Sequence, residues 1–212
     1  MNDKDLILKN INLEIKSKEK VLIIGNSGCG KSTFMKLLLN YNNIERNKII
    51  IDDKDINDYN IKELRNNIAY VSQNETLYTD SIYNNIVLNN VDVSYNKFLD
   101  ICKLTEVDKL VENKYLGYDT LLEENGFNIS GGEKNRIVLS RALLKNFNVL
   151  MLDEALNEID INMERRILKN IFNKYFNKTI IIVSHRLENM DLFDKVIKFS
   201  NGSIEYITKK EK

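Results

Sequence analysis

Gly25-Asn26-Ser27-Gly28-Cys29-Gly30-Lys31-Ser32 is the stretch that decides the fold of this 212-residue chain. It fits the pattern G-x-x-x-x-G-K-[ST], a loop that holds phosphates and is called Walker A. The apolar run 21–24 before it is typical of a buried parallel strand, and residues 33–39 after it predict a helix. Such a loop directs successive backbone N–H groups into one concavity at a helix N-terminus, so we expect a nucleotide phosphate site here.

The residue types of this phosphate loop, residues 25–32, suit ATP with Mg²⁺. Its glycines permit the required backbone shape, Lys31 can reach the β- and γ-phosphates, and the Ser32 hydroxyl can ligate Mg²⁺. Cys29 has two interpretations: a small residue that fits, or a thiol made reactive by Lys31 and the helix N-terminus. The residues expected to bind the nucleotide are Asn26, Ser27, Gly28, Cys29, Gly30, Lys31, Ser32 and Thr33.

Composition narrows the possible partners. Lys and Arg number 31 and Asp and Glu also number 31, so no global basic field argues for nucleic acid as a partner. The two cysteines, Cys29 and Cys102, lack metal-ligand spacing and indicate a reducing compartment. No apolar run approaches the ~20 residues that a transmembrane helix needs.

Strand and helix patterns alternate along much of the chain, which favours an α/β fold with a mostly parallel sheet. The loose apolar alternation in residues 6–15 predicts two edge strands or a hairpin, and so an N-terminal antiparallel β edge. Further strands are expected at 49–51, 68–71, 149–152, 179–183, 196–199 and 204–207, and helices at 61–65, 94–104, 106–113, 132–145 and 161–176. Because residues 74–128 are polar and helical, we expect a P-loop core in residues 1–73 and 147–212, interrupted by a helical subdomain in residues 74–146.

A second motif is Asn148 with the apolar run 149–152, followed by Asp153 and Glu154. At the carboxyl end of a sheet strand, an Asp can hold Mg²⁺ or its water, and an adjacent Glu can deprotonate a water. The pattern alone is weak, because acids after an apolar strand often only mark its exit into solvent. Downstream of a phosphate loop it predicts a metal-supporting Asp153 and a hydrolytic Glu154.

A third motif, Ser130-Gly131-Gly132-Glu133, opens the helix predicted at 132–145. A Ser and two glycines at a helix N-terminus can form an anion site. The other interpretation is an N-cap with a capping box between Ser130 and Glu133. Both can hold at once, but a cap alone does not explain two adjacent glycines.

These motifs, with Gln73 and His185, resemble in order and spacing the ATP-binding cassette (ABC) nucleotide-binding domains, over essentially the whole chain. The combination is specific, because many enzymes share the phosphate loop but not the signature, residues 130–133. In that family two domains pack head to tail and enclose two ATP molecules. Each site uses the phosphate loop of one subunit and the signature of the other. The resemblance therefore implies ATP and Mg²⁺, and a second nucleotide-binding domain as partner, most simply in a homodimer.

The resemblance also implies a role for each motif residue. Ser130, Gly131 and Gly132 would bind the ATP held by the partner. Glu154 would be the general base, and Asp160 would belong to the D-loop, residues 157–160, at the dimer interface. His185, the only histidine and on its own more readily structural, would hold the γ-phosphate and the attacking water. The implied catalytic set is Glu154, His185, Gln73 and Lys31, and the implied metal set is Ser32, Gln73 and Asp153.

Two further segments look like those of membrane exporters, residues 74–86 and 118–126. Residues 126–130 are similar to bacterial peptide and bacteriocin exporters, although drug and lipid exporters share most of this stretch. The implied function is the ATP-hydrolysing motor domain of an exporter, for peptides, at the cytoplasmic face of the cell membrane. Its transmembrane domain is absent from this chain. The alternatives are a soluble ABC ATPase acting on DNA or ribosomes, whose coiled-coil insertions or paired cassettes this chain lacks, and a P-loop kinase, which would not need the signature.

Three departures from the family pattern stand out. Glu133 replaces the commonest residue, Gln, and adds a negative charge near the interface. Asn157 and Glu158 replace the usual small pair in the D-loop. No Phe, Tyr or Trp precedes Phe34, where the family has an aromatic that stacks on adenine, so the chain is expected to begin one strand late.

Overall fold

The computed structural model describes residues 7–42, 44–88 and 93–209. The chain divides into two compact units. The core unit comprises the described parts of residues 1–69, 147–153 and 178–212, and the helical unit comprises those of residues 70–146 and 154–177. The subdomain boundaries at residues 74 and 146 stay a prediction.

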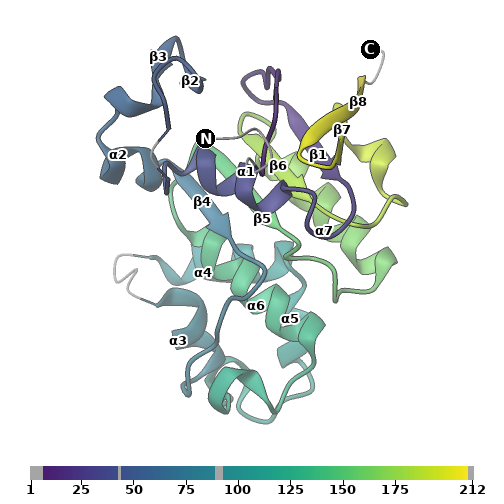
Figure 1. The fold of residues 1–212 in the computed structure, drawn as a ribbon. Coiled ribbons are helices and arrows are strands. Elements are labelled where there is room, and N and C mark those ends of the chain that lie inside the picture. The colour runs from purple at the N-terminus through teal and green to yellow at the C-terminus, as the bar shows by residue number, and fades with distance from the viewer. Residues whose placement is uncertain (1–6, 43, 89–92, 210–212) are drawn as a thin grey trace. The chain divides into compact units, whose positions relative to one another are not determined.

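The core unit is built on a six-stranded sheet with the order β4-β5-β6-β1-β7-β8 (Figure 1). Strand β1 pairs in parallel with β6 and β7, β5 pairs in parallel with β6, and β8 pairs antiparallel with β7. This confirms the mostly parallel sheet. The strands are β1 Lys20–Ile24, β4 Ile68–Val71, β5 Val149–Asp153, β6 Thr179–Val183, β7 Lys195–Ser200 and β8 Ser203–Lys209.

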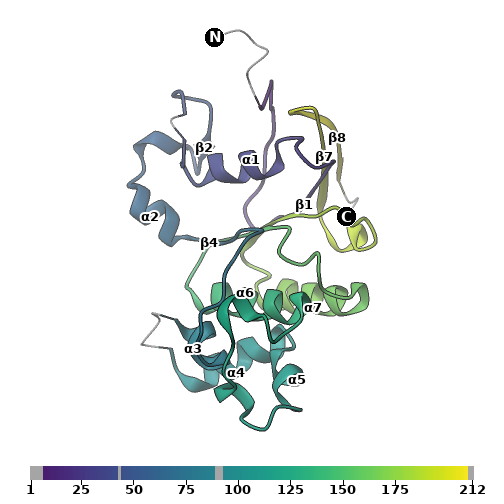
Figure 2. The same ribbon diagram turned by 60° about the horizontal axis from the view of Figure 1, so that its bottom comes forward.

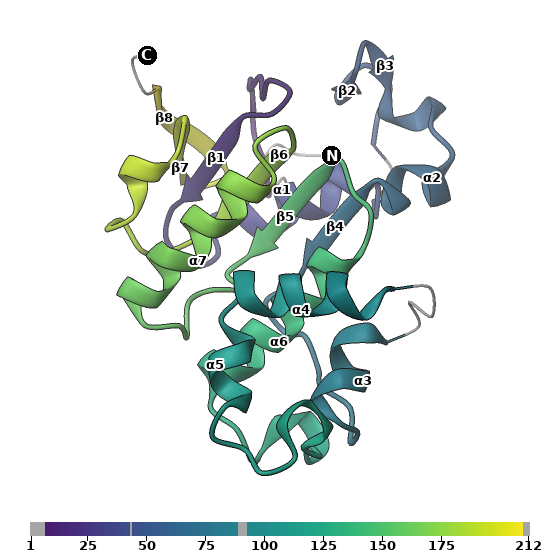
Figure 3. The same ribbon diagram turned by 180° about the vertical axis from the view of Figure 1, so that it is seen from behind.

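The central strands β1, β5 and β6 each contain a continuous apolar run, as a sheet covered on both faces requires. All five residues of β1 are buried. In the register, Asp153 of β5 pairs with Val183 of β6, and Val183 pairs with Ile23 of β1. The carboxyl ends of the three strands therefore meet at one edge of the sheet, which Figure 3 shows from behind.

The remaining core elements are short. Helix α1 covers Lys31–Leu38, two residues earlier at its start than predicted, and α2 covers Ile61–Asn66. Strands β2 Ile50–Ile51 and β3 Lys54–Asp55 form a small antiparallel sheet. Their turn, Asp52-Asp53, has positive φ angles of 48° and 61°. The predicted hairpin around Asn201-Gly202 is confirmed between β7 and β8. Short 3₁₀ segments cover Ile56–Asp58 and Met190–Leu192 in the core unit, and Gly117–Asp119 and Glu124–Gly126 in the helical unit.

The prediction of edge strands in residues 6–15 is wrong for the described residues 7–15, which form no strand, and Leu6 lies outside the described part. Residues 11–15 do alternate between half-buried and exposed, so the period-2 pattern reports an extended chain. A strand also needs a neighbour for its ladder. Here Lys9 N donates to the Gly202 carbonyl (2.7 Å) in the β7–β8 turn, and no ladder follows. The antiparallel pairs lie instead at β2–β3 and β7–β8.

Figure 2 shows the helices of the helical unit gathered together. Those predicted at 94–104, 106–113, 132–145 and 161–176 are confirmed within a few residues, and the side chains of Ser94, Ser130 and Asp160 accept N-cap hydrogen bonds. None of the helices in the described parts of the chain has the length and apolar composition to cross a bilayer. The helices are α3 Ile82–Val87, α4 Tyr95–Leu104, α5 Val107–Val111, α6 Gly131–Leu144 and α7 Ile161–Lys174.

A buried acid, Glu106, links three of these helices. It is 4% exposed at the start of α5 and accepts two bonds from Arg166 of α7, Nε to Oε1 at 2.7 Å and Nη2 to Oε2 at 3.0 Å. Lys109 Nζ lies 3.1 Å from Oε2, and Arg136 of α6 donates to the Glu106 carbonyl. The hydrogen bonds from Arg166 lower the pKa of Glu106 despite its burial.

Replacing Glu106 with Gln is expected to lower the free energy of unfolding at pH 7 by about 1–2 kcal/mol, because the charged hydrogen bonds are weakened and Arg166 is half exposed. The pKa of Glu106 is lower in the folded protein than its unfolded value of about 4.5. The stabilisation is therefore present above that value and is lost as pH falls through the folded pKa. Urea denaturation at pH 7 and about pH 3 measures both effects. Glu112→Gln, an exposed acid at the end of α5, is the matched control. If Glu106→Gln lowered the free energy of unfolding by the same amount at both pH values, the stabilising role of the Glu106 charge would be contradicted.

Candidate functional site

The strand–loop–helix arrangement around residues 25–32 is confirmed: β1 ends at Ile24 and α1 begins at Lys31. Gly28 and Gly30 have φ angles of 77° and 105°, which side-chain-bearing residues rarely adopt. A Cβ on Gly28 would have no heavy atom within 4 Å, so the tip of the loop has open space around it. A phosphate can approach the backbone closely at such a position.

Lys31 lies at the centre of the loop. Its side chain is 4% exposed, and its Nζ donates to the Gly25 carbonyl at 2.8 Å and to the Asn26 carbonyl at 2.9 Å. These bonds curl the loop around one fixed positive charge. The loop therefore presents a cation and backbone amides together, which is the donor set that a polyphosphate needs.

The N-terminus of α1 is suited to an anion. Gly30, its N-cap residue, supplies no side-chain hydrogen bond, and the first turn holds no acid. The first-turn N–H groups and the positive end of the helix dipole are thus not neutralised by α1 itself. Ser32 and Thr33 in this turn are half-buried. Together these features fit a nucleotide triphosphate, and the Ser32 hydroxyl is a ligand type suited to Mg²⁺.

Cys29 is 7% exposed, and its Sγ lies 3.9 Å from Lys31 Nζ. A Cβ added to Gly25 would come within 2.8 Å of the same sulfur. The thiol therefore fills space inside the loop. This favours the interpretation of Cys29 as a small residue that fits, because reactive thiols are partly exposed.

Asp153 and His185 follow neighbouring strands of the core sheet. Asp153 ends β5, is 2% exposed and pairs in register with Val183, the last residue of β6. The next residue, Ser184, donates its backbone N–H to the carbonyl of Ile23 in β1 at 3.1 Å, and the exposed His185 follows it. The core unit thus gathers both residues at the sheet edge where the phosphate loop starts.

Two other predicted residues meet within the helical unit. Gln73 Nε2 donates to Glu154 Oε2 at 3.0 Å, and Asn157 Nδ2 donates to the same oxygen at 3.3 Å. Glu154 has a positive φ of 56°, an uncommon conformation for a side-chain-bearing residue and one found at functional sites. The carboxylate of Glu154 is therefore held by amide donors from two loops.

The signature begins α6 with a complete capping box. Glu133 N donates to Ser130 Oγ (3.3 Å), while Ser130 N and Oγ donate to Glu133 Oε2 (2.7 and 2.8 Å). Burial acts to raise the pKa of Glu133, but these hydrogen bonds and the charges of Lys114 and Arg136 bring it below its usual value. The capping interpretation is confirmed, and phosphate binding by Ser130, Gly131 and Gly132 stays a prediction.

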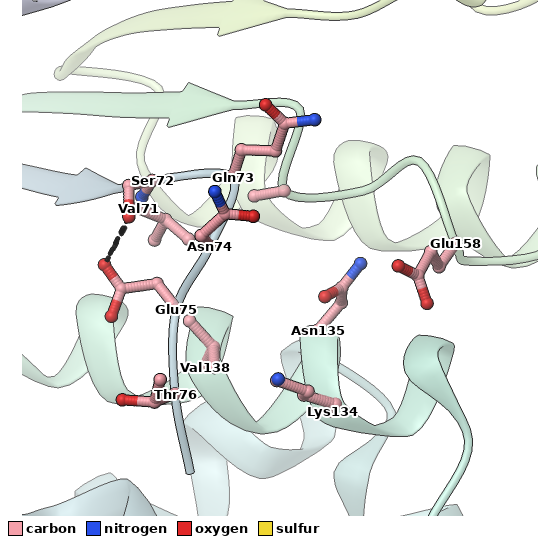
Figure 4. Close-up of a pocket in the computed structure, with 11 residues that line it drawn as sticks. Val71, Ser72, Gln73, Asn74, Glu75, Thr76, Lys134, Asn135, Val138 and Glu158 are labelled. Carbon is pink, nitrogen blue, oxygen red and sulfur yellow. Dashed lines mark hydrogen bonds between the residues drawn. The ribbon is translucent and has the colours of Figure 1, made fainter. Parts of the chain in front are cut away.

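A cavity of about 250 Å³ lies within the helical unit. Figure 4 shows its lining residues, which come from the end of β4 and the segment after it, from α6, and from the segment after β5 that includes the D-loop. This cavity was not predicted from the sequence. In the sequence, the only signal that pointed to Glu158 was its departure from the usual small pair of the D-loop. The lining residues are Val71, Ser72, Gln73, Asn74, Glu75, Thr76, Lys134, Asn135, Val138, Ala155 and Glu158.

Comparison with known proteins gives consistent matches. A family profile described as "ABC transporter" matches residues 8–157. The chain is 36% identical over 198 residues to multidrug resistance protein pgp-1 of Caenorhabditis elegans, covering 93% of this chain and 15% of that protein. It is 36% identical over 203 residues to the ATP-dependent lipid A-core flippase of Idiomarina loihiensis, covering 95% of this chain and 35% of that protein.

A solved structure is similar as well. It is described as a bacterial Atm1-family ABC exporter with ATP bound, and it matches with a TM-score of 0.91 and 30% identity. The match covers 99% of this chain and 37% of that one. The chain thus spans a minor part of the proteins it resembles, 15% of pgp-1 and 35% of the flippase.

Proposed function

This chain belongs to the ABC transporter family as a nucleotide-binding domain of the exporter type, and on that premise we propose that it is the ATP-binding, ATP-hydrolysing motor of a membrane exporter. The main support for this proposal is the structure of the phosphate loop and of the N-terminus of α1. The phosphate loop is curled around Lys31 and leads into α1, whose N-terminus carries neither a side-chain cap nor a first-turn acid. A chain with no use for an anion would gain stability by capping this helix, as α3, α4, α6 and α7 do.

The proposed chemistry is transfer of the γ-phosphoryl group to water. Phosphoryl transfer depends on positioning and charge neutralisation more than on covalent catalysis. Lys31 and the loop amides would hold the phosphates, and Glu154 would accept the proton of the attacking water. Gln73 and His185 would orient that water, while Ser32 and Asp153 would hold the metal. Mg²⁺, when bound, would supply positive charge to the β- and γ-phosphate oxygens.

We propose that two copies assemble head to tail. Each phosphate loop would meet the partner's Ser130, Gly131 and Gly132 across a shared ATP. Hydrolysis then depends on closure, and closure can do mechanical work on a transmembrane domain. The likeness to an exporter structure with ATP bound supports ATP as the nucleotide of this site. The domain would act at the cytoplasmic face of the membrane.

The identity of the transported substrate is a separate question from the motor function. The prediction of peptide export rests on residues 126–130 alone. The relatives include a multidrug resistance protein and lipid A-core flippases, so export of drugs or lipids has at least equal support. Export of peptides stays a prediction.

Mixing two inactive variants tests the shared site. Lys31→Ala disables the phosphate loop. Gly132→Ala disturbs the signature, because the added Cβ would lie 2.8 Å from the Glu158 carbonyl oxygen. Neither homodimer has an intact site, but each mixed dimer has one. An equal mixture should therefore regain about a quarter of normal ATPase activity if subunits pair at random and sites act independently.

The matched control mixes Lys31→Ala with Ser32→Ala. Both substitutions lie in the phosphate loop, so no mixed dimer has an intact site, and the ATPase assay should show no recovery. If the first mixture were no more active than its two variants assayed apart, a site shared between subunits would be contradicted.

A further inference from the structure

Glu158 lies directly on the two signature glycines. A Cβ added to Gly131 would overlap the Glu158 carboxylate and lie 2.6 Å from its Cδ. A Cβ added to Gly132 would lie 2.8 Å from the Glu158 carbonyl oxygen. This contact gives a structural reason for two adjacent glycines in this chain. The D-loop residue occupies the space that side chains at 131 and 132 would otherwise fill.

The contact places negative charge where the proposed function requires phosphate. Gly131 and Gly132 are the first two residues of α6, where the helix dipole and the first N–H groups attract an anion. The carboxylate of Glu133 already accepts bonds from Ser130 at the same end of the helix. Two acids of the same chain therefore lie at the signature, and Figure 4 shows Glu158 beside the start of α6.

We propose that Glu158 competes with nucleotide phosphate for the signature and so raises the ATP concentration needed to close the dimer. The inference rests on the proposed head-to-tail function. Before a phosphate can reach the amides of Gly131 and Gly132, the Glu158 side chain must move away. If it stays close, the two anions repel each other. Glu158 thereby acts against closure without touching the phosphate held in its own loop.

The charge of Glu158 should stabilise the isolated chain, whereas it opposes closure of the dimer. An acid at a helix N-terminus stabilises the helix, so removing it should lower Tm by about 1–4 °C. If Glu158 is purely structural, its replacement should lower Tm and leave closure of the dimer unchanged or weaker. If Glu158 opposes closure, its replacement should lower Tm and also tighten closure. Measuring both quantities separates the two roles.

The experiment compares Glu158→Gln and Glu158→Ala in a Glu154→Gln background, which slows hydrolysis so that the closed dimer can be measured. Gln keeps the size and removes the charge, whereas Ala removes both. Sedimentation velocity gives the ATP concentration for half-maximal dimer. We expect this midpoint to fall about 5- to 30-fold in both variants, which corresponds to a gain of roughly 1–2 kcal/mol. Glu112→Gln makes the same change of net charge at an exposed site and should leave the midpoint unchanged.

Two further measurements sharpen the result. The difference in midpoint between the Glu158→Gln variant and its parent should shrink as salt rises from about 50 to 300 mM, because the repulsion is screened. Affinity of the dilute monomer for a fluorescent ATP analogue should stay within about twofold, because Glu158 acts on the partner's nucleotide.

The outcomes are distinguishable. The ATP concentration for half-maximal dimer could be the same with and without the Glu158 charge. That result overturns the role of Glu158 and leaves the proposed function intact. Absence of any ATP-dependent dimer, in the Glu154→Gln background and all its derivatives, contradicts the proposed function, and this inference fails with it.

Discussion

Replacement of Glu154 with Gln is expected to reduce ATP turnover by about 10²- to 10⁴-fold, the usual contribution of a general base. The amide has nearly the same shape, but it cannot take a proton from water. Its oxygen can still accept the bond that Gln73 Nε2 makes to Glu154 Oε2 at 3.0 Å. The local structure should therefore survive, and the loss should be confined to the chemical step.

Because this substitution leaves Lys31 and the phosphate loop unchanged, ATP should bind with normal affinity. Bound ATP that is not hydrolysed should then accumulate in a closed dimer. Phosphate release measures turnover, and sedimentation velocity with and without ATP measures the dimer. Glu112→Gln is the matched control and should hydrolyse ATP normally. Normal turnover by the Glu154→Gln protein would show that another group is the base.

The sequence was sufficient to predict the sheet but not every edge of it. The apolar runs 21–24, 149–152 and 179–183 need partners on both sides, and parallel pairing between short segments joined by helices satisfies that need. Residues 7–15 show the limit of such reasoning. Their alternation describes side-chain burial, whereas a strand is defined by a hydrogen-bonded neighbour, and that neighbour is not encoded within the segment.

The same distinction holds for the candidate site. The phosphate loop, the signature cap and Asp153-Glu154 are local patterns, so their chemistry follows from adjacent residues. The contact of Glu158 with Gly131 joins positions far apart in the chain and depends on how the D-loop packs against α6. The pairing of Glu106 with Arg166 is also a contact between distant positions. Its two hydrogen bonds make the buried acid tolerable, and no local pattern predicts them. Tertiary contacts of this kind need the fold.

Replacement of Lys31 with Ala is expected to weaken ATP binding by about 10- to 150-fold, because hydrogen bonds to charged groups contribute roughly 1.5–3 kcal/mol. The substitution also removes the donor that bonds the Gly25 and Asn26 carbonyls at 2.8 and 2.9 Å. The loop should then hold its shape less well before ATP arrives. The matched control is Lys36→Ala, which removes an exposed lysine from the same helix.

Thermal unfolding with and without ATP measures this effect. At an ATP concentration about 100 times the normal Kd, binding stabilises the folded state by about 2.7 kcal/mol, or roughly 5–10 °C in Tm for a chain of this size. Lys36→Ala should show the same shift. Lys31→Ala at the same concentration should show less than about half of it, because stabilisation depends on the logarithm of ligand concentration over Kd. A full shift in the Lys31→Ala protein would mean that loop amides alone hold the phosphates and that the buried ammonium serves only to shape the loop.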